Sequence, residues 1–240
     1  MPVDRLEILN CEIEKIRTKA GYKPEDEFKF DTRSRPKQVS FEASTEAKNE
    51  VLGLCQKTGC KFIVHIILHE IIKNQNFDQQ AYWAADYVFG RFNRYLNNEV
   101  HDTGICVIDN IPTKSQYKYL CEKFAKGLVF YNGRSLKLKK IIMFATSCVG
   151  ASHANSAMDI VLGSFRYCIN NPKNTDAAKN MMGKVVDLLW HKKEGEKIYA
   201  TERGLIIRPP IHKIEHEPHK LKYKELIDHI NFLLQKIDKK

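Results

Sequence analysis

Residues Phe144 to Asn170 read FATSCVGASHANSAMDIVLGSFRYCIN, the most informative run in the chain. The run starts inside an apolar segment, residues 141–145, that is typical of a buried strand. Small polar residues follow and lead into a predicted helix. The apolar face predicted for this helix consists of Met158, Val161, Leu162 and Phe165. A buried strand that leads into such a helix predicts an α/β unit.

One carboxylate lies at the edge of this apolar face. Asp159 shares a flank of the predicted helix with Asn155 and Arg166. A carboxylate at the edge of a core is costly unless it is paired, hydrogen-bonded or bound to a metal. Asp159 is therefore either structural, through Arg166 or a neighbouring backbone group, or part of a functional site.

The composition points to a cytoplasmic protein with a polyanionic partner. The 240 residues are long enough for one substantial domain, and 39 Lys and Arg against 29 Asp and Glu give a formal charge of +10. This basic balance suits nucleic acid. Seven cysteines, mostly in apolar runs, predict reduced thiols rather than a disulfide framework. No apolar run approaches the roughly 18 residues that span a bilayer, and the first residues do not resemble a signal peptide, so no membrane association is expected.

Strands and helices alternate along the rest of the chain. The alternation predicts an α/β fold in which at least part of the sheet is parallel. Residues 191–219 contain three prolines and are expected to form a surface extension. Helices are predicted over 3–19, 45–57, 78–96, 113–125, 175–190 and from 220 onward, and strands over 25–30, 61–68, 104–108 and 140–145.

Acidic residues are placed where a metal site could form. Asp109 closes the predicted strand 104–108, and ligands of open α/β sheets bind at the carboxyl ends of strands. The alternative for Asp109 is an Asx-turn or a cap for the following helix. Carboxylates on a strand and on a facing helix commonly hold Mg²⁺ or Mn²⁺, and two such ions about 4 Å apart promote phosphodiester cleavage. Glu27, or Asp31, would be a third source beside Asp109 and Asp159.

Three segments in this order resemble a known family. They are Glu27-Phe-Lys-Phe, the apolar strand that ends at Asp109, and Ser147 followed by His153-Ala-Asn-Ser-Ala-Met-Asp-Ile-Val-Leu-Gly-Ser-Phe. Together they are similar to the domain-of-unknown-function family numbered 3800 (DUF3800), and the resemblance covers most of residues 5–210. Members of that family have a ribonuclease-H-like fold and are suspected metal-dependent nucleases, often linked to phage defence and mobile elements.

The resemblance implies a fold and a set of site residues. In the family an E-x-K segment, a strand-end Asp and a helix written roughly Q-x-A-D-x-x-x-G supply an acidic cluster. The expected fold is a ribonuclease-H-like mixed sheet flanked by helices over residues 1–210, with a C-terminal tail and amphipathic helix, 211–240, packed on the same domain. The resemblance implies that Glu27, Asp109 and Asp159 are the ligands of Mg²⁺ or Mn²⁺. It also implies that Lys29 and His153 lie near the scissile phosphate of nucleic acid, and it matches Gly163 to the glycine that follows the helix Asp.

The chain departs from the family at its start. Family members begin with a strand written like D-E-S-G, whose Asp is the first metal ligand, whereas here Met1 is followed almost at once by a predicted helix. Asp4 precedes that helix and is a poor substitute. Three explanations stay open: a shortened chain, a carboxylate supplied from elsewhere or by a partner, and a fold kept without catalysis. The alternative function is thus an inactive binding or assembly module with a basic surface, and a homo-oligomer or a protein partner stays open.

Histidines offer weaker metal sites. His65 and His69-Glu70 do not have the His-Glu-x-x-His order of a zinc enzyme, and buried or edge histidines are the favoured interpretation. The three histidines His212, His216 and His219 have ligand-like spacing in a loop with proline, which is weak support for a metal site. His153 itself is a general acid, a phosphate contact or a residue of the loop before the helix.

Overall fold

The computed structural model describes residues 1–72, 77–109, 114–130, 133–147, 151–195, 197–201 and 203–235. Its internal contacts group the chain into two compact units. The single domain expected over residues 1–210 stays a prediction. Unit 1 comprises Met1–Phe62, Val149–Leu205 and Pro209–Lys240, and unit 2 comprises Ile63–Cys148 and Ile206–Arg208.

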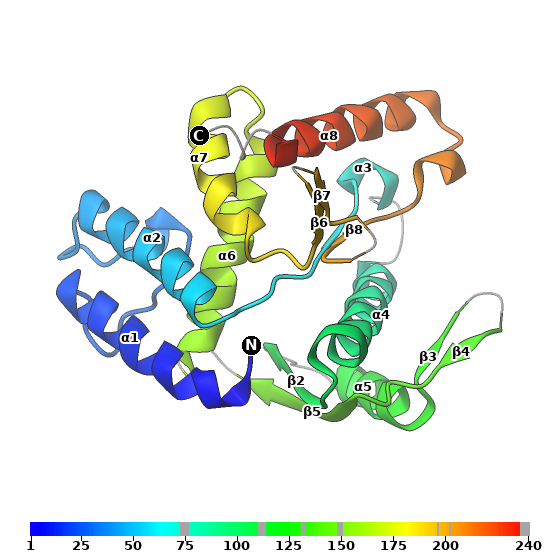
Figure 1. Ribbon diagram of the computed structural model, residues 1–240, viewed down its shortest axis with the longest axis horizontal. Helices are drawn as coiled ribbons and strands as arrows, with labels where there is room; N and C mark the ends of the chain where they lie inside the picture. The colour runs from blue at the N-terminus through cyan, green and yellow to red at the C-terminus, as the bar shows by residue number, and fades with distance from the viewer. Residues whose placement is uncertain are drawn as a thin grey trace. The chain divides into compact units, whose positions relative to one another are not determined.

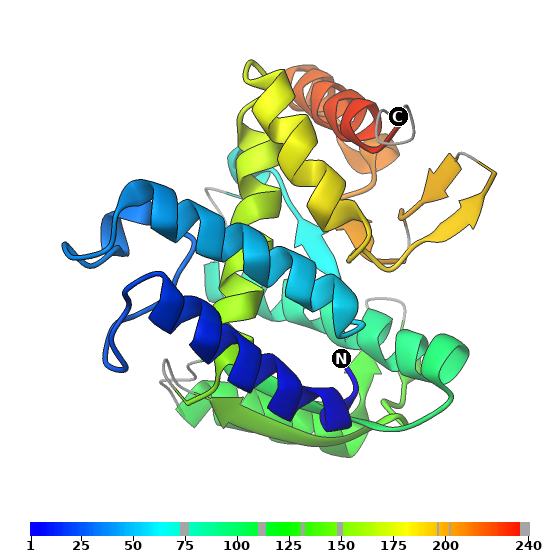
Figure 2. The same ribbon diagram turned by 60° about the vertical axis from the view of Figure 1, so that its left-hand side comes forward.

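Unit 1 is a group of helices around α6 (His153–Asn170), which contacts four other helices. Figure 2 shows α1 and α2 side by side against α6. The C-terminal helix α8 packs on α7 and α6, so residues 217–235 belong to this unit. An antiparallel pair, β6 with β7, completes it. The bounds are α1 (Leu6–Lys19), α2 (Phe41–Lys57), α7 (Thr175–Val186), α8 (Glu217–Gln235), β6 (Lys192–Glu194) and β7 (Lys197–Tyr199), with short 3-10 turns at Val3–Arg5, Thr32–Ser34 and Ile211–Lys213.

The buried face of α6 differs from the predicted one. Met158 and Leu162 are 50% and 44% exposed, so their predicted place in the core is wrong. Because α6 contacts α1 and α2 as well as α7 and α8, small side chains such as Ala157 and Ser164 face inward and allow close helix packing. The buried residues of α6 are Ala157, Ile160, Val161, Ser164, Phe165 and Cys168.

The segment between α1 and α2 is irregular, and the strand predicted over 25–30 is wrong. The Arg17 guanidinium forms hydrogen bonds to backbone carbonyls of this segment. Its Nη2 donates to the Lys23 oxygen at 2.9 Å and to the Asp26 oxygen at 2.6 Å. Backbone groups bonded to a side chain in this way are not available for a strand ladder. Helix α2 begins at Phe41, earlier than predicted, because the Ser40 hydroxyl accepts from a backbone N–H of its first turn.

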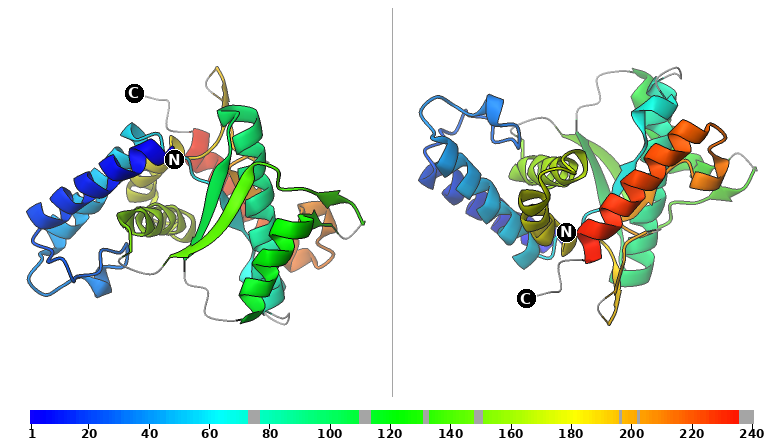
Figure 3. Two further views of the ribbon diagram at one scale, coloured as in Figure 1. Left: turned by 90° about the horizontal axis from the view of Figure 1, so that it is seen from below. Right: turned by 90° about the horizontal axis from the view of Figure 1, so that it is seen from above.

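Unit 2 holds a parallel pair of strands, β2 (Gly104–Asp109) and β5 (Ile141–Ser147), beside helices α4 and α5. The left view of Figure 3 shows these two strands side by side. The prediction that part of the sheet is parallel is therefore confirmed. The core of the unit consists of Phe89, Leu96, Leu120, Leu128, Leu138 and Ile141. The other elements are β1 (Val64–Ile66), α3 (His69–Ile72), α4 (Phe77–Tyr95), a π-helical turn (Leu96–Val100), α5 (Lys114–Lys126), β3 (Leu128–Val129) and β4 (Ser135–Leu136) (Figure 1).

Strand β2 is buried on one face only. Cys106 and Ile108 pack against the core of unit 2, whereas Ile105 and Val107 are 41% and 55% exposed. The apolar run 104–108 predicts a buried strand, and the structure buries one of its two faces. A strand in a two-stranded sheet with helices on one side alternates in burial, as β2 does.

The fold class is mixed α/β with small sheets. In the described ranges the sheets are all two-stranded: β1 pairs with β8 (Leu205–Ile207), β2 with β5, β3 with β4, and β6 with β7. Helices therefore supply most of the regular structure. Among the described helices we find none that is long and apolar enough to cross a membrane.

Candidate functional site

Asp159 meets the Glu27–Phe30 segment within unit 1. The backbone N–H of Phe30 donates to Asp159 Oδ2 at 2.7 Å, which joins positions 129 residues apart. The described part of the chain contains no ion pair between Asp159 and Arg166, so the carboxylate serves the backbone instead. A carboxylate has about four lone-pair positions, so Oδ1 and the second lone pair of Oδ2 can still bind another group.

Gly163 lies one helical turn after Asp159 and faces the same segment. A Cβ atom built on Gly163 would lie 2.3 Å from Cγ of Phe30 and 2.5 Å from its Cβ. Contacts this short exclude any side chain unless the segment moves. Glycine is therefore required at position 163 for the Phe30 ring to pack against α6. Asp159 and Gly163, one helical turn apart, thus contact the same residue: Asp159 accepts the N–H of Phe30, and Gly163 packs against its side chain.

Glu27 and Lys29 extend from this segment and pair with each other. Their carboxylate and ammonium groups are 2.8 Å apart, and the side chains are 50% and 36% exposed. Phe28 between them is buried and packs on Tyr22, with ring centroids 4.9 Å apart. Glu27 and Lys29 therefore lie together while Phe28 is buried, although the backbone is irregular. Asp31, the alternative acidic residue, is 2.9 Å from the Arg33 guanidinium, which lowers the pKa of that carboxyl.

Lys48 of α2 is a site residue that the sequence analysis missed. Its Nζ donates to the carbonyl oxygen of Phe30 at 3.0 Å, and the residue is 8% exposed. Burial lowers the pKa of Lys48, while the carboxylates of Asp31 and Asp159 act in the opposite direction. The peptide groups of Phe30 are thus held by Asp159 on one side and by Lys48 on the other. The available signal was position, because Lys48 lies in the buried stripe of α2, at helical spacing from Ser44 and Val51.

His153 is the first residue of α6, and its side chain contacts α1 rather than the Glu27–Phe30 segment. Its Nε2 lies 2.9 Å from Glu14 Oε2, and the same oxygen accepts from Arg17 Nη1 at 2.8 Å. Burial lowers the pKa of His153, helped by the Arg17 charge and opposed by Glu14. A histidine with a lowered pKa is neutral at pH 7 and can donate or accept one proton. A cavity of about 680 Å³ opens beside it, lined by Asn10, Cys11, Glu14, Lys15, Thr18 and His153.

Asp109 is the last residue of β2, where it lies opposite Ser147 of β5. The prediction that it ends a strand is confirmed, while its side chain lies outside the described part of the structure. Asp109 belongs to unit 2, whereas Glu27 and Asp159 belong to unit 1. Their joint action on a metal stays a prediction. In the described ranges, no group of three or more His, Cys, Asp or Glu side chains is placed to hold a metal ion.

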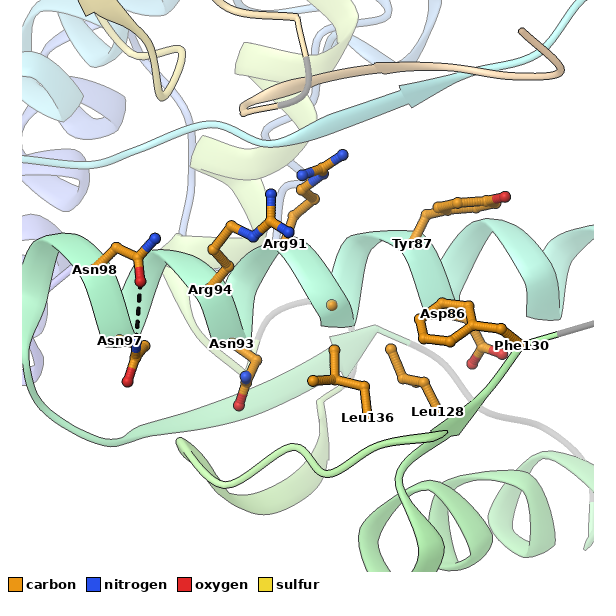
Figure 4. A pocket seen from close by; sticks show the side chains of 11 residues that line it. Asp86, Tyr87, Arg91, Asn93, Arg94, Asn97, Asn98, Leu128, Phe130 and Leu136 are labelled. Atoms are coloured by element: carbon orange, nitrogen blue, oxygen red, sulfur yellow. Dashed lines mark hydrogen bonds between the residues drawn. The ribbon is translucent and has the colours of Figure 1, made fainter. Parts of the chain in front are cut away.

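A second cavity, of about 390 Å³, belongs to unit 2. It lies along α4 and the β3–β4 hairpin, and Figure 4 shows Arg91 and Arg94 extending together from one side of the helix. Leu128 and Leu136 of the hairpin supply an apolar wall. The remaining lining is rich in side-chain amides, from Asn93, Asn97 and Asn98. Guanidinium and amide groups are the side chains that commonly contact phosphates and base edges.

Comparison with known proteins gives no relative: no family model, no curated protein and no solved structure matches this chain.

Proposed function

We propose that this chain is a ribonuclease-H-like domain of the DUF3800 type that hydrolyses phosphodiester bonds of nucleic acid with Mg²⁺ or Mn²⁺. Glu27 and Asp159 would hold the metal in unit 1, with Asp109 as the third ligand and Lys29 and His153 acting near the phosphate. The single observation that carries the proposal is the hydrogen bond from Phe30 to Asp159. It brings together two of the three segments on which the resemblance to the nuclease family rests.

The residues of unit 1 fit a magnesium ion in their chemistry. Mg²⁺ is usually held by one or two carboxylates, with waters and substrate oxygens filling the other positions. Glu27 is half exposed, and Asp159 keeps lone pairs beyond its bond to Phe30. When bound, the metal would stabilise negative charge on the phosphoryl oxygens. Lys29, which neutralises Glu27 in the free protein, would then be released to contact a phosphate.

The test exploits the two roles that Asp159 can have. An Asp159→Asn variant keeps an oxygen that accepts from the Phe30 N–H but loses the charge that a metal requires. If Asp159 binds metal, we expect cleavage of labelled DNA or RNA in Mg²⁺ or Mn²⁺ to fall about 100-fold or more with little change in thermal stability. Asp109→Asn should act in the same way, and addition of EDTA should abolish cleavage by the wild type.

A matched control is Asp176→Asn, because the Asp176 side chain is 93% exposed in the first turn of another helix of the same unit. It should cleave at the wild-type rate. If Asp159→Asn and Asp109→Asn both cleave at the wild-type rate, the metal site is refuted. A wild type that shows no cleavage with either ion on single- or double-stranded DNA and RNA would favour the second candidate function.

The second candidate is a binding module without catalysis, and the cavity along α4 supports it. Arg94 is exposed at this cavity and is available to a phosphate. Arg94→Gln should weaken binding to a labelled oligonucleotide in EDTA and reduce the slope of log affinity against log salt by about 1. Arg166→Gln, on the exposed side of α6, is the control. Equal salt slopes for the wild type and Arg94→Gln would exclude this cavity as a phosphate site.

A further inference from the structure

Helix α2 ends in a turn that brings two cysteines together. Gly59, with φ at +71°, donates its N–H to Gln56 O at 3.1 Å, and the Cys60 N–H donates to Cys55 O at 2.9 Å. This pair of bonds defines a Schellman motif, in which the side chains at the two positions now held by Cys55 and Cys60 normally touch. In most helices that contact is between two apolar residues. In this chain cysteines occupy both positions.

The two thiols are unlike in exposure and in acidity. Cys55 is 1% exposed, whereas Cys60 is partly exposed, and the Thr58 hydroxyl lies 3.4 Å from Cys60 Sγ. A hydrogen bond with the Cys55 thiol lowers the pKa of Cys60, and the Thr58 hydroxyl adds to this effect against the opposing effect of burial. The same bond, together with burial, raises the pKa of Cys55. The more exposed of the two sulfurs is therefore also the more acidic one.

We propose that Cys55 and Cys60 form a peroxide-reactive dithiol, in which Cys60 is the attacking thiolate and Cys55 is the resolving thiol. The motif places a partly exposed cysteine, Cys60, next to a second and buried cysteine, Cys55, which is the arrangement such a pair requires. The inference goes beyond the proposed function and does not depend on it.

The chemistry balances with hydrogen peroxide as the oxidant. The Cys60 thiolate attacks one peroxide oxygen, the O–O bond breaks, and the leaving hydroxide takes a proton to become water. Cys60 is now a sulfenic acid, oxidised by two electrons, while the peroxide has been reduced. The Cys55 sulfur then attacks the Cys60 sulfur, the S–O bond breaks, and the Cys55 proton leaves with the hydroxide as a second water. A small thiol such as dithiothreitol reverses the disulfide by exchange.

The first measurement compares thiol reactivity along the full-length chain. Cys11 and Cys121 are exposed thiols and serve as internal references. At pH 6.5, where an ordinary cysteine with a pKa of about 8.5 is almost all thiol, we expect iodoacetamide to alkylate Cys60 about tenfold faster than either reference. Peptide mass spectrometry reads all three sites in one sample. A Cys60 rate at or below those of Cys11 and Cys121 would overturn the assignment of the nucleophile.

The second measurement follows oxidation. Hydrogen peroxide should give one intramolecular Cys55–Cys60 disulfide, absent from Cys60→Ser. In Cys55→Ala, which removes the resolving thiol, the Cys60 sulfenic acid should instead accumulate and be trapped by dimedone. Circular dichroism checks that both variants are folded. Formation of other disulfides in place of this one, or dimedone labelling of Cys55 in the Cys60→Ser variant, would refute the proposed order of events. Because the readout is thiol chemistry, failure of this test leaves the nuclease proposal unchanged, and the converse also holds.

Discussion

Buried cations are used differently in the two units. In unit 1, Lys48 of α2 donates to the backbone carbonyl of Phe30, in the irregular segment between α1 and α2. In unit 2, Lys123 of α5 donates instead to the Asp86 carboxylate of α4 at 2.7 Å, with both side chains less than a fifth exposed. The hydroxyl of Tyr119 donates to the same carboxylate.

The two cations differ in the charge of the group that accepts their hydrogen bond. A carbonyl group is neutral, so a cation bound to it stabilises a segment that no sheet stabilises, but the cation keeps its full charge. An ion pair joins two helices that already have regular structure, and each partner neutralises the other. Removing one member of the pair in unit 2 should therefore leave an uncompensated charge, whereas removing Lys48 in unit 1 leaves only an unsatisfied carbonyl.

The largest effect is expected for Asp86→Ala. This change leaves the Lys123 ammonium without its acceptor in a mostly buried place, while the Tyr119 hydroxyl keeps only the Tyr82 carbonyl. We expect a loss of roughly 3 kcal/mol in the free energy of unfolding, measured by urea denaturation. The double variant Asp86→Ala/Lys123→Met removes both charges and should recover at least half of the loss. A double variant no more stable than the single one would show that the pair does not behave as a buried ion pair.

Gly163→Ala should have the next largest effect, because its methyl group would overlap the Phe30 ring. We expect a loss of about 2 kcal/mol in stability and a shift of the segment that carries Glu27 and Lys29. Gly53→Ala is the matched control: Gly53 lies in a helix of the same unit, and nothing lies within 4 Å of its added Cβ. It should be neutral or stabilising by up to about 1 kcal/mol. Equal destabilisation by the two changes would contradict the close packing of Phe30 on α6.

Lys48→Met should cost less, about 1 kcal/mol, since the lost bond to Phe30 O is offset by removal of a buried charge. The pH dependence distinguishes the two contributions. Burial lowers the pKa of Lys48 in the folded state, so the unfolded chain binds this proton more tightly. Stability of the wild type should therefore rise as the pH increases from the folded pKa toward the unfolded value of about 10.4. Thermal unfolding between pH 8 and 10 should show this gain in the wild type and not in Lys48→Met.

Lys29→Ala should have the smallest effect on stability. The pair with Glu27 is exposed to solvent, and such pairs contribute about 0.5 kcal/mol or less. The proposed function predicts a different result for activity, because Lys29 would contact the phosphate. A large loss of cleavage with an unchanged melting temperature supports that role, whereas a large drop in melting temperature would show that Lys29 is a structural residue.

Local patterns predicted the helices and the parallel strand pair, and they failed where distant residues decide the backbone. The spacing of apolar residues is enough to define α1, and the β-branched run before Asp109 is enough to define β2. The segment 25–30 has the alternation of a strand, but its Asp26 carbonyl is bonded to Arg17 of a preceding helix and its Phe30 carbonyl to Lys48 of a following one. No local pattern contains that information.

The same limit applies to the candidate site. The sequence marks Asp159 as a carboxylate that needs a partner, but the partner is a backbone N–H 129 residues away. Lys48 carries only a weak local signal, a lysine within a buried helical stripe. The order of motifs was therefore enough to name Glu27 and Asp159 as candidate site residues. That Asp159 is bonded to the segment of Glu27, through the N–H of Phe30, could be found only from the three-dimensional structure.

The double anchoring of Phe30 has a consequence for how this region can be observed. Its N–H and its C=O are both bonded to side chains, although the residue lies outside regular secondary structure. Its amide hydrogen should therefore exchange with solvent as slowly as those of a helix, in a segment where neighbouring amides exchange quickly. Any ion or substrate that draws the Asp159 carboxylate away would accelerate that exchange. A single amide signal thus reports, without label or cleavage, on occupancy of the candidate site.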